Sequence, residues 1–287
     1  MRRLLAGFGV LAVLCMIGGS FSEAAGAEPQ EKIGSYYLNR GIRYLARDDY
    51  EAAAADLTQA IARNPESAEA YFNRGVAYRH MNRLPEALAD LNKALALNPK
   101  MAEAYLSRGV VYSDQGENDL ALVDYTRAIN LKADLGLAYF NRGIVHLRQG
   151  NYTQAVADFD QALKINPDKA EVYVNRGVAH KQLGRSDRAL ADYDQALRLN
   201  PQLAEAYLNR GLVYGQKGDY NRAVADFDKA LKINPKSVEA YQSRAVAYYS
   251  KKDYAKAWED VQSARDLGGE FPPEFLQALR TASGREN

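Results

Sequence analysis

The chain has 287 residues, of which 47% are apolar and 25% are charged, and its formal net charge at pH 7 is +1. This composition is close to the globular average and excludes a largely disordered chain. A chain with almost no net charge lacks the general attraction to phosphate on which nucleic-acid binding depends, so we expect no nucleic-acid partner. The single cysteine, Cys15, excludes an internal disulfide framework and a cysteine zinc site.

The first 27 residues differ from the rest of the chain. Two arginines, Arg2 and Arg3, precede an apolar run at residues 4–19, and small residues lead up to Ala27. This pattern is typical of a secretory signal peptide, so we expect cleavage after Ala27 and a periplasmic or otherwise exported protein. An uncleaved anchor in the inner membrane over residues 4–19 is the alternative, although the run is short for a hydrocarbon core of about 30 Å. Only that alternative gives the chain a membrane partner.

A short linker is expected at residues 28–33, before a repeat with a period of 34 residues. The triplet Asn-Arg-Gly, or a close variant of it, recurs seven times at this interval. A fixed period of this length is typical of stacked helical repeats. We number the positions of each copy from 1 to 34. The seven copies span residues 34–67, 68–101, 102–135, 136–169, 170–203, 204–237 and 238–271.

Each copy carries the pattern of two amphipathic helices. Position 4 is tyrosine in all copies and shares a helical face with positions 8 and 11, and positions 20, 24 and 27 share a face in the second half. Small residues at positions 8 and 20 allow the two helices to approach closely. Position 15 is Gly, Asn or Asp, which suits the left-handed end of a helix, and Lys252 is the exception. An Asn-Pro pair near position 32 ends the second helix in five copies.

These positions resemble the tetratricopeptide repeat (TPR), which has 34 residues with an aromatic residue at 4, glycine at 8, tyrosine at 11, alanine at 20 and 27 and proline at 32. The resemblance covers about five-sixths of the chain. It implies an all-α solenoid, a right-handed superhelix of seven helix-turn-helix repeats with a concave and a convex face. Residues 272–287 are expected to add a capping helix, from Pro273 to Arg280, and a frayed tail.

Two charged positions occur in every copy. Position 7 is arginine and position 23 is aspartate, although TPR proteins more often place an apolar residue at position 7. We predict that each arginine forms a structural ion pair with an aspartate of the same or an adjacent copy, in preference to binding an anionic ligand. The arginines are Arg40, Arg74, Arg108, Arg142, Arg176, Arg210 and Arg244, and the aspartates are Asp56, Asp90, Asp124, Asp158, Asp192, Asp226 and Asp260.

Position 6 carries a row of amides, and the resemblance places this position on the concave groove. Such a row can hydrogen-bond an extended peptide backbone, although simple solvation of the groove explains it equally well. Position 5 adds apolar side chains, which either contact a peptide or pack between the first helices. The predicted groove contacts are Asn39, Asn73, Asn141, Asn175, Asn209, Phe72, Phe140 and Leu208.

Together, the resemblance and these positions predict a non-enzymatic scaffold that binds a peptide or a partner protein in the groove, in the bacterial cell envelope. The alternative is a structural or self-associating subunit of an envelope complex that uses its convex face or its ends. No metal-binding motif, phosphate-binding motif or set of catalytic residues stands out, so we expect no enzyme activity, no cofactor and no metal. Apolar residues at position 9 argue against the TPR clamp for a free peptide carboxylate, which needs asparagine there.

Overall fold

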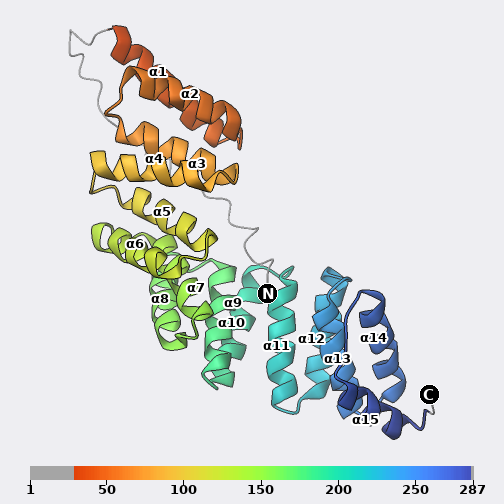
Figure 1. Cartoon of the computed structure of the whole chain (residues 1–287). Coiled ribbons are helices and arrows are strands. Elements are labelled where there is room, and N and C mark those ends of the chain that lie inside the picture. The colour runs from red at the N-terminus through yellow and green to blue at the C-terminus, as the bar shows by residue number, and fades with distance from the viewer. Residues whose placement is uncertain (1–28, 286–287) are drawn as a thin grey trace. The chain divides into compact units, whose positions relative to one another are not determined.

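A computed structural model describes residues 29–285, and it confirms the predicted all-α class (Figure 1). Each of the seven copies supplies two helices, and a further helix follows the seventh copy. The helices within the described residues are α1 Pro29–Leu45, α2 Tyr50–Arg63, α3 Ala68–His80, α4 Leu84–Leu97, α5 Ala102–Asp114, α6 Asn118–Leu131, α7 Gly136–Arg148, α8 Tyr152–Ile165, α9 Ala170–Gln182, α10 Ser186–Leu199, α11 Ala204–Gln216, α12 Tyr220–Ile233, α13 Val238–Ser250, α14 Tyr254–Asp266 and α15 Pro273–Ser283.

The beginning of α1 corrects one sequence prediction. We expected a linker over residues 28–33, but the helix already begins at Pro29. Proline suits the first turn because its missing N–H has no partner to lose there, and Glu31 lies at the positive end of the helix dipole. The signal-peptide and anchor predictions lie outside the described residues. Among the helices that are described, none is both long and apolar enough to cross a bilayer.

The chain divides into two compact units, which we describe separately. The first holds copies 1–3, and the second holds copies 4–7 with α15. Within each unit, consecutive first helices contact one another, whereas consecutive second helices make no comparable contacts in the described part. The first helices are therefore the more closely spaced layer, on the inner side of each unit. We call the side chains at positions 2, 5, 6, 9 and 12 of the first helices the inner face, and the exposed side of the second helices the outer face.

The two helices of a copy approach closely at position 8. A Cβ atom added to Gly177 in α9 would lie 2.6 Å from Cε1 of Tyr193 in α10, so a larger residue does not fit beside this ring. Copy 7 has Ala245 instead of glycine, and the residue at position 24 is the smaller Val261. Both lie in one buried cluster. The sizes of the residues at positions 8 and 24 therefore compensate each other.

The turn inside each copy places position 15 in the left-handed region. Its φ angle lies between 58° and 83° in all seven copies. Lys252, which departs from the preferred residue types, adopts φ 63° as well. Because lysine has a Cβ atom, this conformation costs about 1 kcal/mol that glycine avoids. The second helices end as expected, with asparagine as the C-cap before each Asn-Pro proline.

The last helix, α15, covers the seventh copy. It runs to Ser283, three residues beyond the predicted end at Arg280. Leu279 is fully buried, and Trp258 of α14 donates a hydrogen bond from Nε1 to Oγ of Ser283 over 3.1 Å. The apolar side of the last copy is thereby shielded from water, as a repeat array requires at its ends.

Candidate functional site

The arginine at position 7 and the aspartate at position 23 meet within each copy. In copy 6, Nε of Arg210 lies 2.8 Å from Oδ2 of Asp226, and Nη2 lies 2.6 Å from Oδ1. All seven pairs have this two-pronged geometry. The aspartates are buried. The structure thus places both partners in the same copy, sixteen residues apart.

The same arginine also reaches the preceding copy through Nη1. Its acceptor is position 25 of that copy's second helix. The contacts are Arg74 to Thr58 and Arg108 to Asn92 in the first unit, and Arg176 to Asp160, Arg210 to Asp194 and Arg244 to Asp228 in the second. One guanidinium therefore ties together three helices. Sequence reasoning missed position 25 because its residue type changes between copies.

A tyrosine ring completes the surroundings of each of these arginines. In copy 6, Cζ of Arg210 lies 5.5 Å from the ring centre of Tyr207 at position 4, a cation–π arrangement. The hydrogen bonds to Asp90 and Asp124 raise the pKa of Arg74 and Arg108, respectively, above the ordinary value. Carboxylates and rings therefore occupy the guanidinium groups, which leaves little capacity for an anionic ligand.

Copy 1 closes its own end of the array. Positions 3 and 10 are alanine or valine in the other six copies, and those residues are buried. In copy 1 they are Tyr36, which is 52% exposed, and the exposed Arg43. The hydroxyl of Tyr36 accepts a hydrogen bond from Nη1 of Arg40 over 3.0 Å. Tyr36 thus supplies the acceptor that a preceding copy provides elsewhere.

The amides at position 6 do not all present the same atoms. Nδ2 of Asn73 and Nδ2 of Asn175 each donate to the backbone carbonyl four residues earlier, over 2.8 Å. Their Oδ1 atoms remain as acceptors on the half-exposed inner face. Asn39 is exposed, Asn141 is half-exposed, and neither forms a hydrogen bond to another described residue through its side chain. These four asparagines are therefore available to a ligand.

Asn209 differs, and its prediction as a groove contact is wrong. Only 9% of it is exposed. Its Nδ2 donates to the carbonyl of Glu205, and its Oδ1 accepts a hydrogen bond from Nζ of Lys181 over 3.1 Å. Lysine occurs at position 12 only in copy 5, so only copy 6 has its amide covered in this way.

Phe140 is also misassigned as a groove contact. It is 6% exposed and belongs to a core cluster with Phe159 and Val172. Phe72 and Leu208 are partly buried and pack against core clusters as well. Position 5 therefore packs mainly between helices. Position 9 remains partly exposed, and Val246 in copy 7 is 47% exposed.

Two histidines replace the tyrosine at position 11 in consecutive copies. Nε2 of His146 lies 4.0 Å from Oδ2 of Asp158, and Nε2 of His180 lies 4.0 Å from Oδ2 of Asp192. The Nδ1 atom of each is buried and has no hydrogen-bond partner among residues 29–285. Burial lowers the pKa of both side chains, and the neighbouring aspartates oppose this shift. His180 is buried and His146 is half-buried, and each lies beside the ion pair of its own copy.

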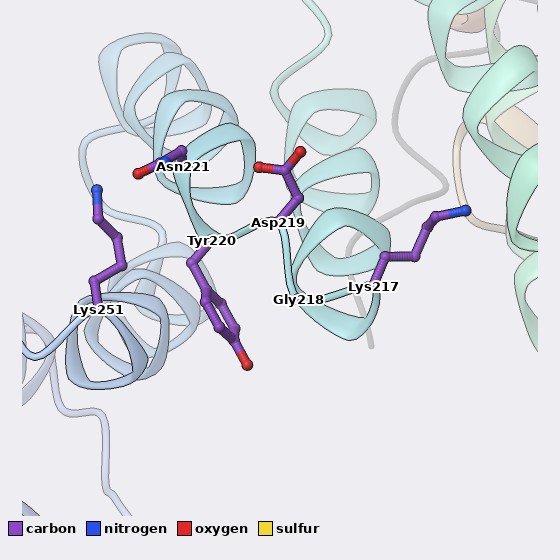
Figure 2. A pocket seen from close by; sticks show the side chains of 6 residues that line it. All are labelled: Lys217, Gly218, Asp219, Tyr220, Asn221 and Lys251. Atoms are coloured by element: carbon purple, nitrogen blue, oxygen red, sulfur yellow. The ribbon is translucent and has the colours of Figure 1, made fainter.

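A pocket of about 380 Å³ lies at the turns of copies 6 and 7 (Figure 2). Asp219 is the N-cap of α12 and accepts from the backbone N–H of Arg222. Lys217 points away from the other lining side chains and binds Asp187 through Nζ over 2.7 Å. Asp219 and Lys217 are therefore already engaged within the protein. Within residues 29–285, no group of His, Cys, Asp and Glu side chains is arranged to hold a metal ion.

Family models match most of the repeat array. Models described as Tetratricopeptide repeat match residues 38–100 and 140–204, residues 204–237 and residues 227–259. A model described as TPR repeat matches residues 111–150. A search of curated proteins finds no match.

Solved structures show the same fold. YrrB, described as a TPR protein with an unusual peptide-binding site, is 27% identical, with a TM-score of 0.59 over 67% of this chain and 98% of its own. PilF of Pseudomonas aeruginosa is 21% identical, with a TM-score of 0.69 over 76% and 99%. A TPR protein of Parabacteroides merdae is 21% identical, with a TM-score of 0.62 over 88% and 100%. From the repeats, the paired helices and these matches we conclude that the chain belongs to the tetratricopeptide repeat family.

Proposed function

We propose that this protein is a scaffold that binds a polypeptide along the inner face of its first helices. TPR proteins are in general protein-interaction scaffolds without enzyme activity. YrrB, which is 27% identical, is described as having a peptide-binding site. These likenesses favour a polypeptide ligand. The asparagines at position 6 that are available to such a ligand lie on the inner face.

The observation that carries the proposal is a pair of available amides on consecutive first helices within each unit, Asn39 with Asn73 in the first unit and Asn141 with Asn175 in the second. Asn73 and Asn175 hold their amide N–H groups against their own helices and leave Oδ1 as an acceptor. Asn141 forms no side-chain hydrogen bond to another described residue. Acceptors on consecutive first helices of one unit suit the N–H groups of an extended backbone, and the partly exposed apolar residues at position 9 add contact area beside them.

A free peptide carboxylate is a poor ligand for this face. The described residues at position 9 are apolar in every copy, so they provide no side-chain donor for an anionic chain end. The aspartates hold the arginines at position 7. We therefore propose that the ligand binds through an internal segment of its chain.

We further propose that the scaffold works in the cell envelope. The support is the sequence of residues 1–27, with two arginines, an apolar run and small residues before Ala27. A comparison of the mature N-terminus with the printed sequence, by Edman degradation of the exported protein, tests this. A mature chain that starts at Glu28 supports the proposal, and a chain that retains residues 4–19 supports an anchor instead.

The alternative, assembly through the outer face, rests on a different observation. Leu120 and Val123 lie on the outer side of α6 and are 47% and 66% exposed. The other copies have alanine or polar residues at these two positions. An exposed apolar pair of this kind marks a contact surface in some proteins.

Two double variants separate these two functions, and a third serves as the matched control. We expect Asn141→Ala combined with Asn175→Ala to abolish capture of the polypeptide partner from envelope extracts while the melting temperature stays the same. The matched control removes two amides from the outer face of α8, Gln154→Ala with Gln161→Ala, and both of these residues are exposed. Loss of the partner only in Leu120→Gln with Val123→Gln contradicts the inner-face proposal.

A further inference from the structure

Two carboxylates on the inner face of copies 6 and 7, one half-buried and one exposed, have no ion-pair partner within the described residues. Glu205 in α11 and Glu239 in α13 occupy position 2 of copies 6 and 7. Lys181 in α9 is the cation that acts on both carboxylates, yet its Nζ hydrogen-bonds Oδ1 of Asn209. No basic side chain within the described residues comes within 4.0 Å of either carboxylate. Two acidic groups thus share one ammonium that contacts neither.

In copy 3, the glutamate at the same position has an ion-pair partner. Oε1 of Glu103 lies 2.9 Å from Nζ of Lys132, a residue of its own copy. Lys132 stands at position 31, where copy 6 has Asn234 and copy 7 has Gly268. Copies 6 and 7 therefore have no lysine at the position that pairs with Glu103 in copy 3, so Glu205 and Glu239 lack this counter-ion.

Burial makes this imbalance costly at Glu205. Its side chain is half-buried, and this burial raises its pKa. Glu239 raises the pKa further, and Lys181 lowers it only in part. A carboxylate in this state gains from any cation brought beside it, because the added charge favours its ionised form.

Tyr193 provides an independent sign that the cluster is incomplete. Its side chain has no exposed area, and its hydroxyl has no hydrogen-bond partner within the described residues. Glu205 is the charged group with the largest effect on this hydroxyl. Copies 4 and 6 have Phe159 and Phe227 at the same position, so the packing does not need a hydroxyl. A buried polar group without a partner calls for an explanation, and a ligand that orders the neighbouring inner face of copy 6 would supply one.

We propose that Glu205 and Glu239 form a subsite for a basic side chain, lysine or arginine, of the bound polypeptide. The inference rests on the proposed function, because the subsite belongs to the same inner face as Asn175. The ligand is an extended segment whose basic residue lies between copies 6 and 7. Lys181 and Asn209 hold the helices around the subsite and leave the two carboxylates to the ligand.

The test uses the full chain labelled with ¹³C at the glutamate carboxyl carbons. The probes are blocked pentapeptides, Ala-Ala-Lys-Ala-Ala and the same peptide with norleucine in place of lysine. We expect the lysine peptide to bind about tenfold more tightly, a difference of about 1.4 kcal/mol, and to shift the Glu205 signal. E205Q with E239Q should reduce this preference to less than about twofold.

The matched control is E103Q, which removes an inner-face carboxylate that already has its own lysine. It should leave the preference for the lysine peptide unchanged. Equal affinity of both peptides for the natural chain would overturn the subsite and leave the inner-face proposal standing. If neither peptide shifts any inner-face signal, both the subsite and the proposed function are wrong.

Discussion

Arg210 and Asp194 belong to different copies, and Nη1 of the arginine lies 2.6 Å from Oδ1 of the aspartate. The same guanidinium holds Asp226 of its own copy with two further hydrogen bonds. Arg210 thus joins α10, α11 and α12. This relationship recurs in the second unit through Arg176 and Arg244.

The two aspartates around Arg210 should differ in their effect on stability. Asp226 has 7% of its side chain exposed, so Asp226→Ala leaves a half-buried arginine without its main partner and should cost about 3 kcal/mol. Asp194 has 42% of its side chain exposed, and Asp194→Ala should cost less than about 1 kcal/mol. Urea unfolding measures both. Similar costs for the two variants would contradict the distinction.

The histidines His146, which is half-buried, and His180, which is buried, should make stability depend on pH. Burial lowers the pKa of His146 and His180 in the folded chain, so below the ordinary value of about 6.5 the unfolded chain binds more protons. Stability should therefore fall as the pH drops through 6.5, by at most about 1.4 kcal/mol per pH unit for each histidine, and should not change on this account above it.

Tyrosine, the residue at position 11 in the other copies, provides the control. His146→Tyr with His180→Tyr should flatten the fall in the free energy of unfolding between pH 7.5 and pH 5.5. Some dependence should remain, because burial also lowers the pKa of His80 in copy 2. An unchanged pH profile in the double variant would mean that these two histidines do not carry the effect.

The left-handed turn of copy 7 leaves room for a stabilising change. Lys252 has φ 63°, whereas Gly184 fills the same position of copy 5 at φ 72°. Lys252→Gly should raise the free energy of unfolding by about 1 kcal/mol, because glycine adopts this conformation without steric cost. Gly184→Ala should lower it by a similar amount. Thermal and urea unfolding of the two variants check the opposite signs.

Positions 8 and 24 should be coupled energetically. Gly177→Ala places a methyl group against the ring of Tyr193 and should cost about 1–3 kcal/mol. In Tyr193→Val this extra methyl group should cost much less, since copy 7 combines Ala245 with Val261. A double-mutant cycle measures the coupling, and additive costs would show that the sizes do not compensate.

Features that recur in the sequence could be predicted well. Tyrosine at position 4, glycine at position 8 and Asn-Pro near position 32 specify the paired helices and their ends. The recurrence of arginine and aspartate indicated an ion pair. It could not show whether the two partners belong to the same copy or to adjacent copies. That choice depends on the distance between helices, which the spacing alone does not give.

Features that belong to one copy could not be predicted from the repeat. The burial of Asn209 depends on Lys181, and no other copy has lysine at position 12. Phe140 was assigned to the groove because of its register, but it packs in a core cluster with Phe159 and Val172. Tyr36 and Arg43 of copy 1 were missed for the same reason, because the repeat pattern has alanine or valine at these two positions.

The most direct test of the account compares two sites in copy 5. A photo-activatable amino acid is placed at Val178, a partly exposed position of the inner face, or at Ala191, an exposed position of the outer face. After irradiation of cells, mass spectrometry identifies the cross-linked polypeptides. The account predicts that Val178 yields a cross-linked polypeptide that the natural chain in excess displaces, and that Ala191 does not. Cross-links formed from Ala191 alone would contradict binding on the inner face.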